Sequence, residues 1–89
     1  MHLKDTEIVA DQAAIAGVLD SRPFADPAHR GWVFRTAGAI HDRAWWTAFV
    51  DELRAAGYDD ALSIENEDVL QSPVEGVEEA AALILPMLA

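Results

Sequence analysis

The sequence has no cysteine and few basic residues. The lack of cysteine excludes disulfide bonds and thiolate metal sites. Six Lys and Arg stand against sixteen Asp and Glu, so the formal net charge is −10. Nucleic acids and anionic membranes are bound through basic patches, and this charge argues against both as partners. No apolar run approaches the ~18 residues of a membrane-spanning helix, and no signal-peptide pattern opens the chain, so we expect a cytoplasmic protein.

The chain of 89 residues is short for its hydrophobic content of 52%. At this length it forms one domain at most, and it buries only about 60–65% of the surface that its unfolded chain exposes. We therefore expect apolar patches of the kind that drive association.

One helix is predicted over residues 43–56, with Asp42 as its N-cap and Gly57 at its end. Its apolar residues follow the spacing of a single buried face: Trp46, Phe49, Val50 and Leu53. A last helix begins at a capping box, with Ser72 at the N-cap, Pro73 at the first position and Glu75 at the third. Its inner face is predicted to hold Val77, Ala81, Ile84 and Leu88, and Pro86 should distort its final turn.

The segment before residue 42 predicts loops with two short elements. Asp11 is a candidate cap for a short helix that Gly17 ends. Residues 32–35 predict an extended segment, and we interpret residues 6–31 as an excursion outside the core.

Residues 61–64 predict a short buried strand, which Glu65, Glu67 and Asp68 follow. A helix, a tight turn, an apolar strand and then acids are typical of parallel α/β proteins, whose chemistry collects at the carboxyl ends of strands. The front of the chain, with His2, is a second such strand end. A divalent-metal site at the two ends is the first hypothesis, because imidazole and carboxylate suit Mn, Co, Zn and Mg.

A set of residues in order along the chain points to a known family: His2-Leu3-Lys4-Asp5-Thr6-Glu7, Trp32-Val33-Phe34-Arg35-Thr36, Trp46, Phe49, Gly57-Tyr58-Asp59, Ser63-Ile64-Glu65-Asn66-Glu67-Asp68 and Glu75-Gly76. Together they resemble the sugar phosphate isomerase/epimerase family, which consists of xylose isomerase-like TIM barrels. The resemblance implies an α/β fold, and more narrowly a partial TIM barrel made of the last two β/α units, with two parallel strands and flanking helices. Residues 1–89 would then be the C-terminal portion of a barrel of about 250 residues, a single partial domain.

The resemblance also implies a site and a reaction. Family members bind one divalent metal ion (Mn, Mg, Co or Zn) and isomerise or epimerise sugars by proton abstraction through an enediolate. His2 and Glu65 match metal ligands, Glu65 also matches a catalytic acid/base carboxylate, and Arg35 matches a contact to the sugar or sugar-phosphate substrate. The remaining ligands would lie on absent strands, so the chain alone is expected to be inactive and to require the remaining barrel segment or self-association.

Two positions depart from the family pattern. Asn66 stands where the family motif carries histidine, which puts a substrate contact in doubt. Ile40 stands where the second glycine of a Gly-x-Gly pair is usual, and isoleucine resists positive φ.

Each assignment has an alternative. Glu67 and Asp68 are candidate loop caps or water-facing acids. Lys4 and Asp5 could orient ligands or pair with each other, and Arg35 could form a structural salt bridge. His29 and His41 are expected to be surface loop residues. For the whole chain, the alternatives are one half of a split barrel enzyme and a small acidic non-catalytic interaction protein. An endonuclease-type relative of the family is less favoured because the segment is acidic.

Overall fold

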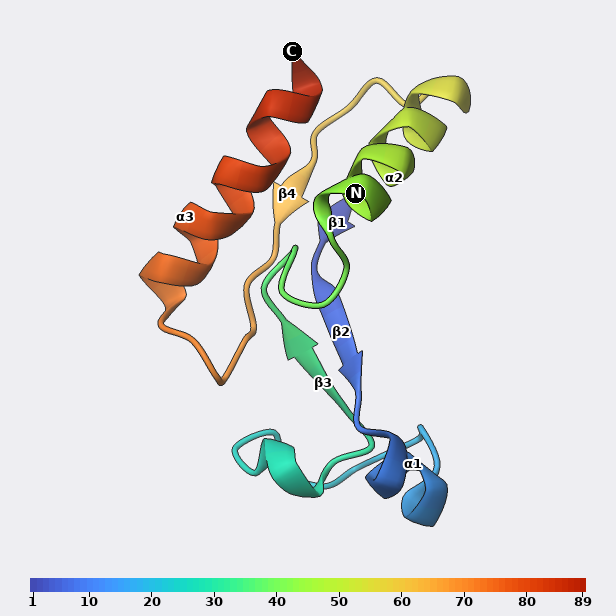
Figure 1. The fold of residues 1–89 in the computed structure, drawn as a ribbon, viewed down its shortest axis with the longest axis vertical. Coiled ribbons are helices and arrows are strands. Elements are labelled where there is room, and N and C mark those ends of the chain that lie inside the picture. The colour runs from blue at the N-terminus through green and yellow to red at the C-terminus, as the bar shows by residue number, and fades with distance from the viewer.

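The computed structural model describes all residues from 1 to 89, and its secondary structure forms two small sheets with three α-helices (Figure 1). In chain order the elements are β1 (His2–Leu3), β2 (Asp5–Ile8), α1 (Ala10–Ala16), the 3-10 helix η1 (Pro27–His29), β3 (Trp32–Arg35), α2 (Arg43–Ala55), β4 (Ser63–Ile64), α3 (Pro73–Ile84) and the 3-10 helix η2 (Leu85–Leu88). The radius of gyration is 14.3 Å, whereas a compact domain of this length has about 12 Å. The molecule is therefore elongated.

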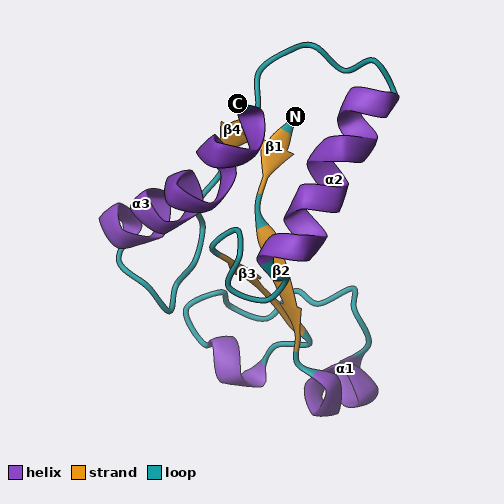
Figure 2. Cartoon of the chain, turned by 45° about the horizontal axis from the view of Figure 1, so that its top comes forward, coloured by secondary structure: helices purple, strands orange, loops and turns teal.

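The first sheet is a parallel pair of β1 and β4, with Leu3 opposite Ile64. Helices α2 and α3 both pack on one face of this pair (Figure 2). The buried core consists of Leu3 from β1, Trp46 from α2, Ala80 and Ile84 from α3, and Ala37 from the loop before α2. Because side chains alternate along a strand, Leu3 points into this core while its neighbours His2 and Lys4 point to the opposite face.

Helix α2 confirms its prediction to within one residue. The Asp42 side chain accepts a hydrogen bond from the backbone N–H of Trp45, which caps the first turn. Trp46 and Val50 are buried, and Phe49 and Leu53 are half-buried beside them. The apolar spacing in the sequence therefore identified the buried face correctly.

Helix α3 confirms its predicted start and part of its predicted face, because Ile84 is buried and Ala81 half-buried, whereas Leu88 is exposed. Ser72 Oγ accepts from the backbone N–H of Glu75 at 3.2 Å, which is one half of the capping box. The buried residues are Gly76, Ala80 and Ile84, whereas Val77 remains 45% exposed. The prediction for Val77 was wrong because α3 is apolar on two adjacent faces, and spacing alone does not tell which one meets the sheet. Beyond α3, the chain continues as η2 around Pro86, in agreement with the predicted distortion.

The second sheet is an antiparallel pair of β2 and β3, in which Asp5 lies opposite Arg35 and Ile8 opposite Trp32. The predicted extended segment over residues 32–35 is confirmed as β3, but residues 6–8 belong to its partner strand rather than to an excursion. Helix α1 follows β2 and ends at Gly17, which has a φ of 73°. Its N-cap is Val9 rather than Asp11, whose carboxylate accepts from the next backbone N–H inside the helix.

This architecture corrects the fold that the resemblance implied. A partial TIM barrel consisting of the last two β/α units would contain parallel strands only, each followed by a helix. Here two of the four strands form an antiparallel pair that extends away from α2 and α3 (Figure 1). The parallel pair spans two residues in each strand. The fold is therefore a small α/β arrangement of two separate two-stranded sheets, and the partial-barrel assignment is wrong.

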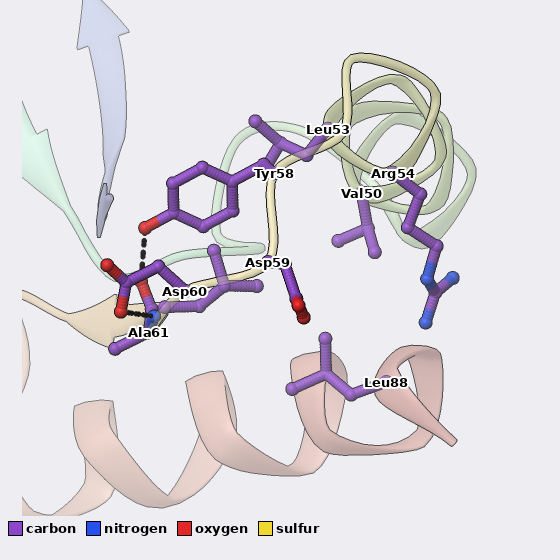
Figure 3. A pocket seen from close by; sticks show the side chains of 9 residues that line it. Val50, Leu53, Arg54, Tyr58, Asp59, Asp60, Ala61 and Leu88 are labelled. Carbon is purple, nitrogen blue, oxygen red and sulfur yellow. Dashed lines mark hydrogen bonds between the residues drawn. The ribbon is translucent and has the colours of Figure 1, made fainter.

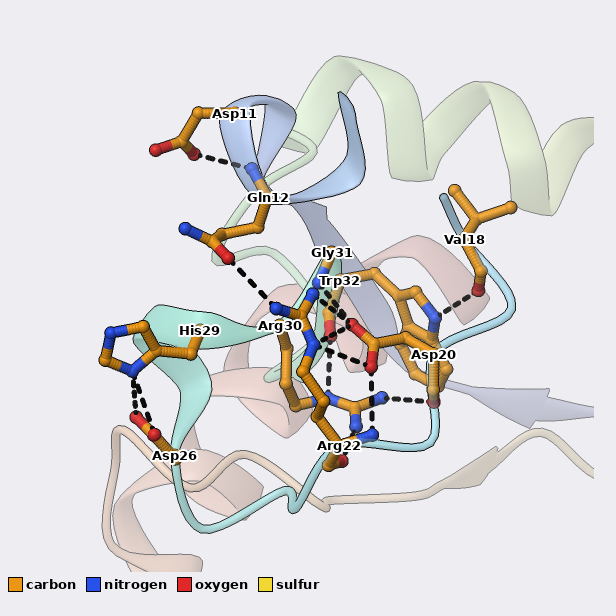
Figure 4. A network of polar contacts seen from close by, with 10 residues as sticks. All are labelled: Asp11, Gln12, Val18, Asp20, Arg22, Asp26, His29, Arg30, Gly31 and Trp32. Carbon is orange, nitrogen blue, oxygen red and sulfur yellow. Dashed lines mark hydrogen bonds and ion pairs between the residues drawn. The ribbon is translucent and has the colours of Figure 1, made fainter. Parts of the chain in front are cut away.

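Residues between α1 and β3 are held by a network of polar contacts (Figure 4). Asp20 accepts hydrogen bonds from the Arg22 guanidinium and from the backbone N–H of Gly31 at 2.7 Å. These donors lower the pKa of Asp20 far below its ordinary value, with the Arg22 side chain as the largest cause. Arg30 is fully buried and donates to the carbonyl oxygens of Asp20, Arg22 and Trp32.

Candidate functional site

The candidate site lies on the face of the parallel pair that α2 and α3 do not cover. His2 at the start of β1 and Glu65 directly after β4 are 63 residues apart in sequence, yet His2 Nδ1 lies 2.7 Å from Glu65 Oε2. The backbone N–H of Glu65 donates to the carbonyl of Leu3 at 3.0 Å, which extends the strand pairing to the site. His2 and Glu65 thus lie side by side, as expected from the sequence. That they bind a metal ion stays a prediction.

Lys4 completes this site. Its ammonium group lies 2.9 Å from Glu65 Oε1 and 3.1 Å from Glu67 Oε1. The same group sits over the ring of Phe34 from β3, 4.0 Å from the ring centroid, in the geometry of a cation–π contact. Lys4 therefore joins the candidate site to the second sheet. The sequence contained a signal for this position, because residues two apart in a strand share a face.

The charge state of Glu65 follows from these neighbours. Lys4 is the largest cause that lowers the pKa of Glu65 to about 2, and Glu67 and His2 add to the effect. The pKa of Lys4 is raised in turn by its hydrogen bond to Glu65. At neutral pH Glu65 is a carboxylate and Lys4 an ammonium ion. A carboxylate this acidic suits a metal ligand better than a general base, whose pKa works best near the operating pH.

The donor set fits part of a divalent-metal site. His2 and Glu65 offer one imidazole nitrogen and one carboxylate oxygen, the ligand types that Mn, Co and Zn accept. Glu65 Oε1 is taken by Lys4, and no group of three or more His, Cys, Asp or Glu side chains is arranged so that it could hold a metal ion. Since protein metal sites use three or four such ligands, the pair supplies about half of one.

Arg35, the predicted substrate contact, belongs to a separate network. Its Nη1 lies 2.9 Å from Glu7 Oε1, and its Nε lies 3.1 Å from Asp68 Oδ2. No hydrogen bond or ion pair joins Arg35 to the candidate site. The structural salt bridge, named from the sequence as the alternative, is the arrangement observed, and the substrate contact stays a prediction.

Asp68 is the centre of that network. Its side chain is fully buried and accepts from the backbone N–H and hydroxyl of Thr36 at 2.8 and 3.1 Å, and from the backbone N–H of Leu70 at 2.8 Å. Burial raises the pKa of Asp68, but the hydrogen bonds from Thr36, Leu70 and Arg35 outweigh it and the pKa is lowered. Asp68 is thus a buried anchor between the end of β3 and the segment after β4, which agrees with its alternative reading as a cap.

Asp5 and His41 form a second polar pair that the sequence did not predict. Asp5 is buried and accepts from the backbone N–H groups of Thr6, Ile40 and His41. His41 Nδ1 lies 2.5 Å from Asp5 Oδ1, and its ring packs on Trp45 with the ring centroids 4.3 Å apart. Burial raises the pKa of Asp5, and these hydrogen bonds more than reverse it. The pair fixes the loop that leads into α2. His29, the last residue of η1, is paired with Asp26 and is exposed, which confirms its expected surface position but not the expected loop.

A hollow of about 390 Å³ lies apart from the candidate site, between the end of α2, residues 58–62 and η2 (Figure 3). Val50, Leu53 and Leu88 form apolar walls, and the Asp59 carboxylate points into the space. Neither His2 nor Glu65 lines it.

Among the helices, none combines the length and the apolar character needed to cross a bilayer.

The chain is similar to "Uncharacterized protein YfiH" of Bacillus subtilis (strain 168), with 34% identity over 77 residues, which cover 86% of this chain. The match covers 25% of YfiH, so the chain spans about a quarter of that relative's length. No family model matches the chain, and no solved structure matches it.

Proposed function

We propose that this chain supplies part of the active site of a divalent-metal-dependent sugar or sugar-phosphate isomerase or epimerase. The observation that carries the proposal is the 2.7 Å contact between His2 and Glu65, which brings two metal-ligand types together from distant parts of the sequence. The residue pattern that resembles the isomerase/epimerase family supplies the reaction class. We also propose that the protein acts in the cytoplasm.

His2 Nδ1 and Glu65 Oε2 would hold the cation. When bound, a divalent cation in such a site polarises the carbonyl of the substrate as a Lewis acid. Lys4 holds the other oxygen of Glu65, so the carboxylate keeps one orientation and stays ionised. For Glu65 to accept a proton from carbon, its pKa must rise, and release of the Lys4 contact is the change within this chain that would raise it.

The rest of the site would come from outside these residues. The pair offers two ligands, whereas a working site needs three or four. The similarity to a quarter of YfiH supports the idea that such residues act within a larger unit. We therefore propose that the chain alone does not turn over sugars.

A second candidate function is that of an acidic, non-catalytic interaction protein. The observation in its favour is the number of large apolar side chains left exposed, among them Leu19, Ile15 and Val74. This candidate needs no metal, so metal binding discriminates between the two functions.

The test is paramagnetic broadening of the NMR signals of the chain by Mn²⁺. We expect signals of His2, Ser63 and Glu65 to broaden first, and His2→Gln and Glu65→Gln each to remove the effect without changing the circular dichroism spectrum. The matched control is Asp51→Asn, because Asp51 is an exposed acid on α2 away from the pair. Broadening that follows exposed acids in general, or that survives Glu65→Gln, would contradict the proposed site.

Activity requires the larger unit. We expect a chimera, in which the 77 aligned residues replace their counterpart in YfiH, to exchange deuterium from D₂O into the carbon next to the carbonyl of a ketose or ketose phosphate. The Glu65→Gln chimera should bind less metal and lose the exchange. A folded, metal-loaded chimera that exchanges nothing with a panel of such sugars would refute the reaction class while leaving the metal site standing.

A further inference from the structure

Helix α3 carries more apolar surface than the core of this chain covers. One stripe, formed by Gly76, Ala80 and Ile84, is buried: Ala80 and Ile84 lie in the core with Leu3 and Trp46, and Gly76 lies against the Asn66 side chain. With 3.6 residues per turn, the apolar positions of α3 extend over roughly 200° of its circumference. A helix that faces water on its outer side is typically apolar on a narrower stripe than this.

The second stripe of α3 is exposed. Its members lie at helical spacing next to the buried stripe: Val74 at 67% exposure, Val77 at 45%, the half-buried Ala81, and Leu85 at 63%, the first residue of η2, which continues α3. Figure 1 shows α3 at the outer edge of the molecule, with β4 on one side of it and no element on the other. We call this set the outer stripe of α3.

The charges around the outer stripe indicate what covers it. The remaining part of the helix surface carries Glu75, Glu78 and Glu79, all exposed, and α3 has no basic residue in its last turn. A second copy of this chain would place acids against acids within a net charge of −10, and like charges across an interface are repulsive. A covering element with basic residues beside its apolar face is complementary to this surface.

We infer that the outer stripe of α3 is a docking surface for an amphipathic helix with a leucine-type apolar face and Lys or Arg flanks, from a polypeptide segment other than residues 1–89. The inference deepens the proposed function and rests on it for one point, namely that the residues completing the site lie outside this chain. The relative YfiH has three quarters of its length beyond the matched part, which is the kind of segment that could provide such a helix. Val74, Val77 and Ala81 follow the i, i+3 and i+7 spacing of one helix face, which suits packing against the apolar face of a second helix.

The test uses the whole chain and two synthetic helical peptides as probes. Both peptides have about 18 residues and the same leucine pattern; one carries Lys and the other Glu at the flanking positions. We expect the Lys peptide to bind at least about tenfold more tightly than the Glu peptide and to shift NMR signals along the outer stripe. Val77→Asp and Leu85→Asp should each weaken binding by about tenfold, and because both side chains are exposed, the fold of the chain should be unchanged.

Leu19→Asp is the matched control, because Leu19 is 97% exposed and lies in the loop after α1. Binding that Leu19→Asp weakens as much as Val77→Asp, or shifts spread over all acidic surfaces, would overturn the docking surface. A concentration-dependent dimer in sedimentation that Leu85→Asp abolishes would assign the stripe to a second copy and overturn the proposed occupant. The peptides are tested without metal, so failure here leaves the Mn²⁺ result at His2 and Glu65 intact, and failure of Mn²⁺ binding leaves the docking surface intact.

Discussion

Replacement of Asp68 by alanine should remove a large part of the stability of this protein. The Asp68 side chain is fully buried and accepts four hydrogen bonds, one of them from Arg35, whose side chain is 21% exposed. In the variant Arg35 retains Glu7, and the Thr36 hydroxyl retains Gln71, but the buried Thr36 N–H has no partner. An unpaired buried donor costs about 1–3 kcal/mol, and a broken buried ion pair costs about 3–5 kcal/mol. Because Arg35 is partly hydrated and keeps one partner, we expect about 3 kcal/mol for Asp68→Ala and about 1–2 kcal/mol for Asp68→Asn, which keeps an acceptor.

Urea denaturation followed by circular dichroism measures this loss. For a small domain with an m-value near ~1 kcal/mol per M, Asp68→Ala should lower the denaturation midpoint by about 3 M. The control is Asp51→Ala, an exposed acid whose pair with Arg54 is 3.5 Å long, and its effect should stay within about 0.5 kcal/mol. An Asp68→Ala loss below about 1 kcal/mol would refute the view that this carboxylate is a buried anchor.

The same anchor predicts a pH dependence. The pKa of Asp68 is lower in the folded chain than its ordinary value, so its protonation favours the unfolded state. The contribution of Asp68 to stability is fully present above the unfolded pKa of about 4, and it is lost as the pH falls through the lower folded value. In Asp68→Asn this part of the acid sensitivity should be absent, and an unchanged slope of stability with pH below about 4 would contradict the assignment.

Two further substitutions follow from local geometry. Gly38 and Gly57 both have positive φ, at 94° and 82°, but an added Cβ would meet a Leu83 side-chain atom at 2.6 Å only at Gly38. Gly38→Ala should therefore lower the thermal midpoint more than Gly57→Ala, whose cost is about 1 kcal/mol of backbone strain. Equal thermal midpoints for the two variants would contradict the contact with Leu83. Ser72→Ala removes the side-chain acceptor at the start of α3 and should cost about 1 kcal/mol in urea denaturation, whereas Ser21→Ala, at an exposed loop residue, should cost nothing measurable.

The sequence predicted the helices best, because their signals are local. The apolar spacing from Trp46 to Leu53 and the caps at Asp42 and Ser72 lie within a few residues of the structure that they specify. The face of α3 was harder to assign, since Val77 and Ala80 are both apolar and only contact with the sheet distinguishes them.

The antiparallel pair was missed because its strands are separated by a long connection. Residues 9–31 lie between β2 and β3, and the short-range turn signals of a hairpin apply only to loops of a few residues. The partial barrel was predicted from a resemblance, and a resemblance of residues does not determine how many strands a short chain pairs. The structure has a parallel pair of two-residue strands and a second sheet of the other sense.

The candidate site was predicted in part. The approach of His2 to Glu65 followed from the expectation that two strand ends converge, and the distance between them confirms that approach. The roles of Lys4 and Arg35 depend on which carboxylates lie near them, and this depends on contacts across more than 25 residues of sequence. Pairings at such distances are set by the fold as a whole rather than by local spacing.

Lys4 is the single residue between β1 and β2, so one extended segment belongs to both sheets. This continuity sets where the protein tolerates changes in length. One residue inserted next to Lys4 would turn the Lys4 side chain to the opposite face of the strand, away from Glu65 and Phe34. The connection over residues 9–31 belongs to neither sheet, so additions are best placed at its exposed positions, away from Asp20 and the buried Arg30.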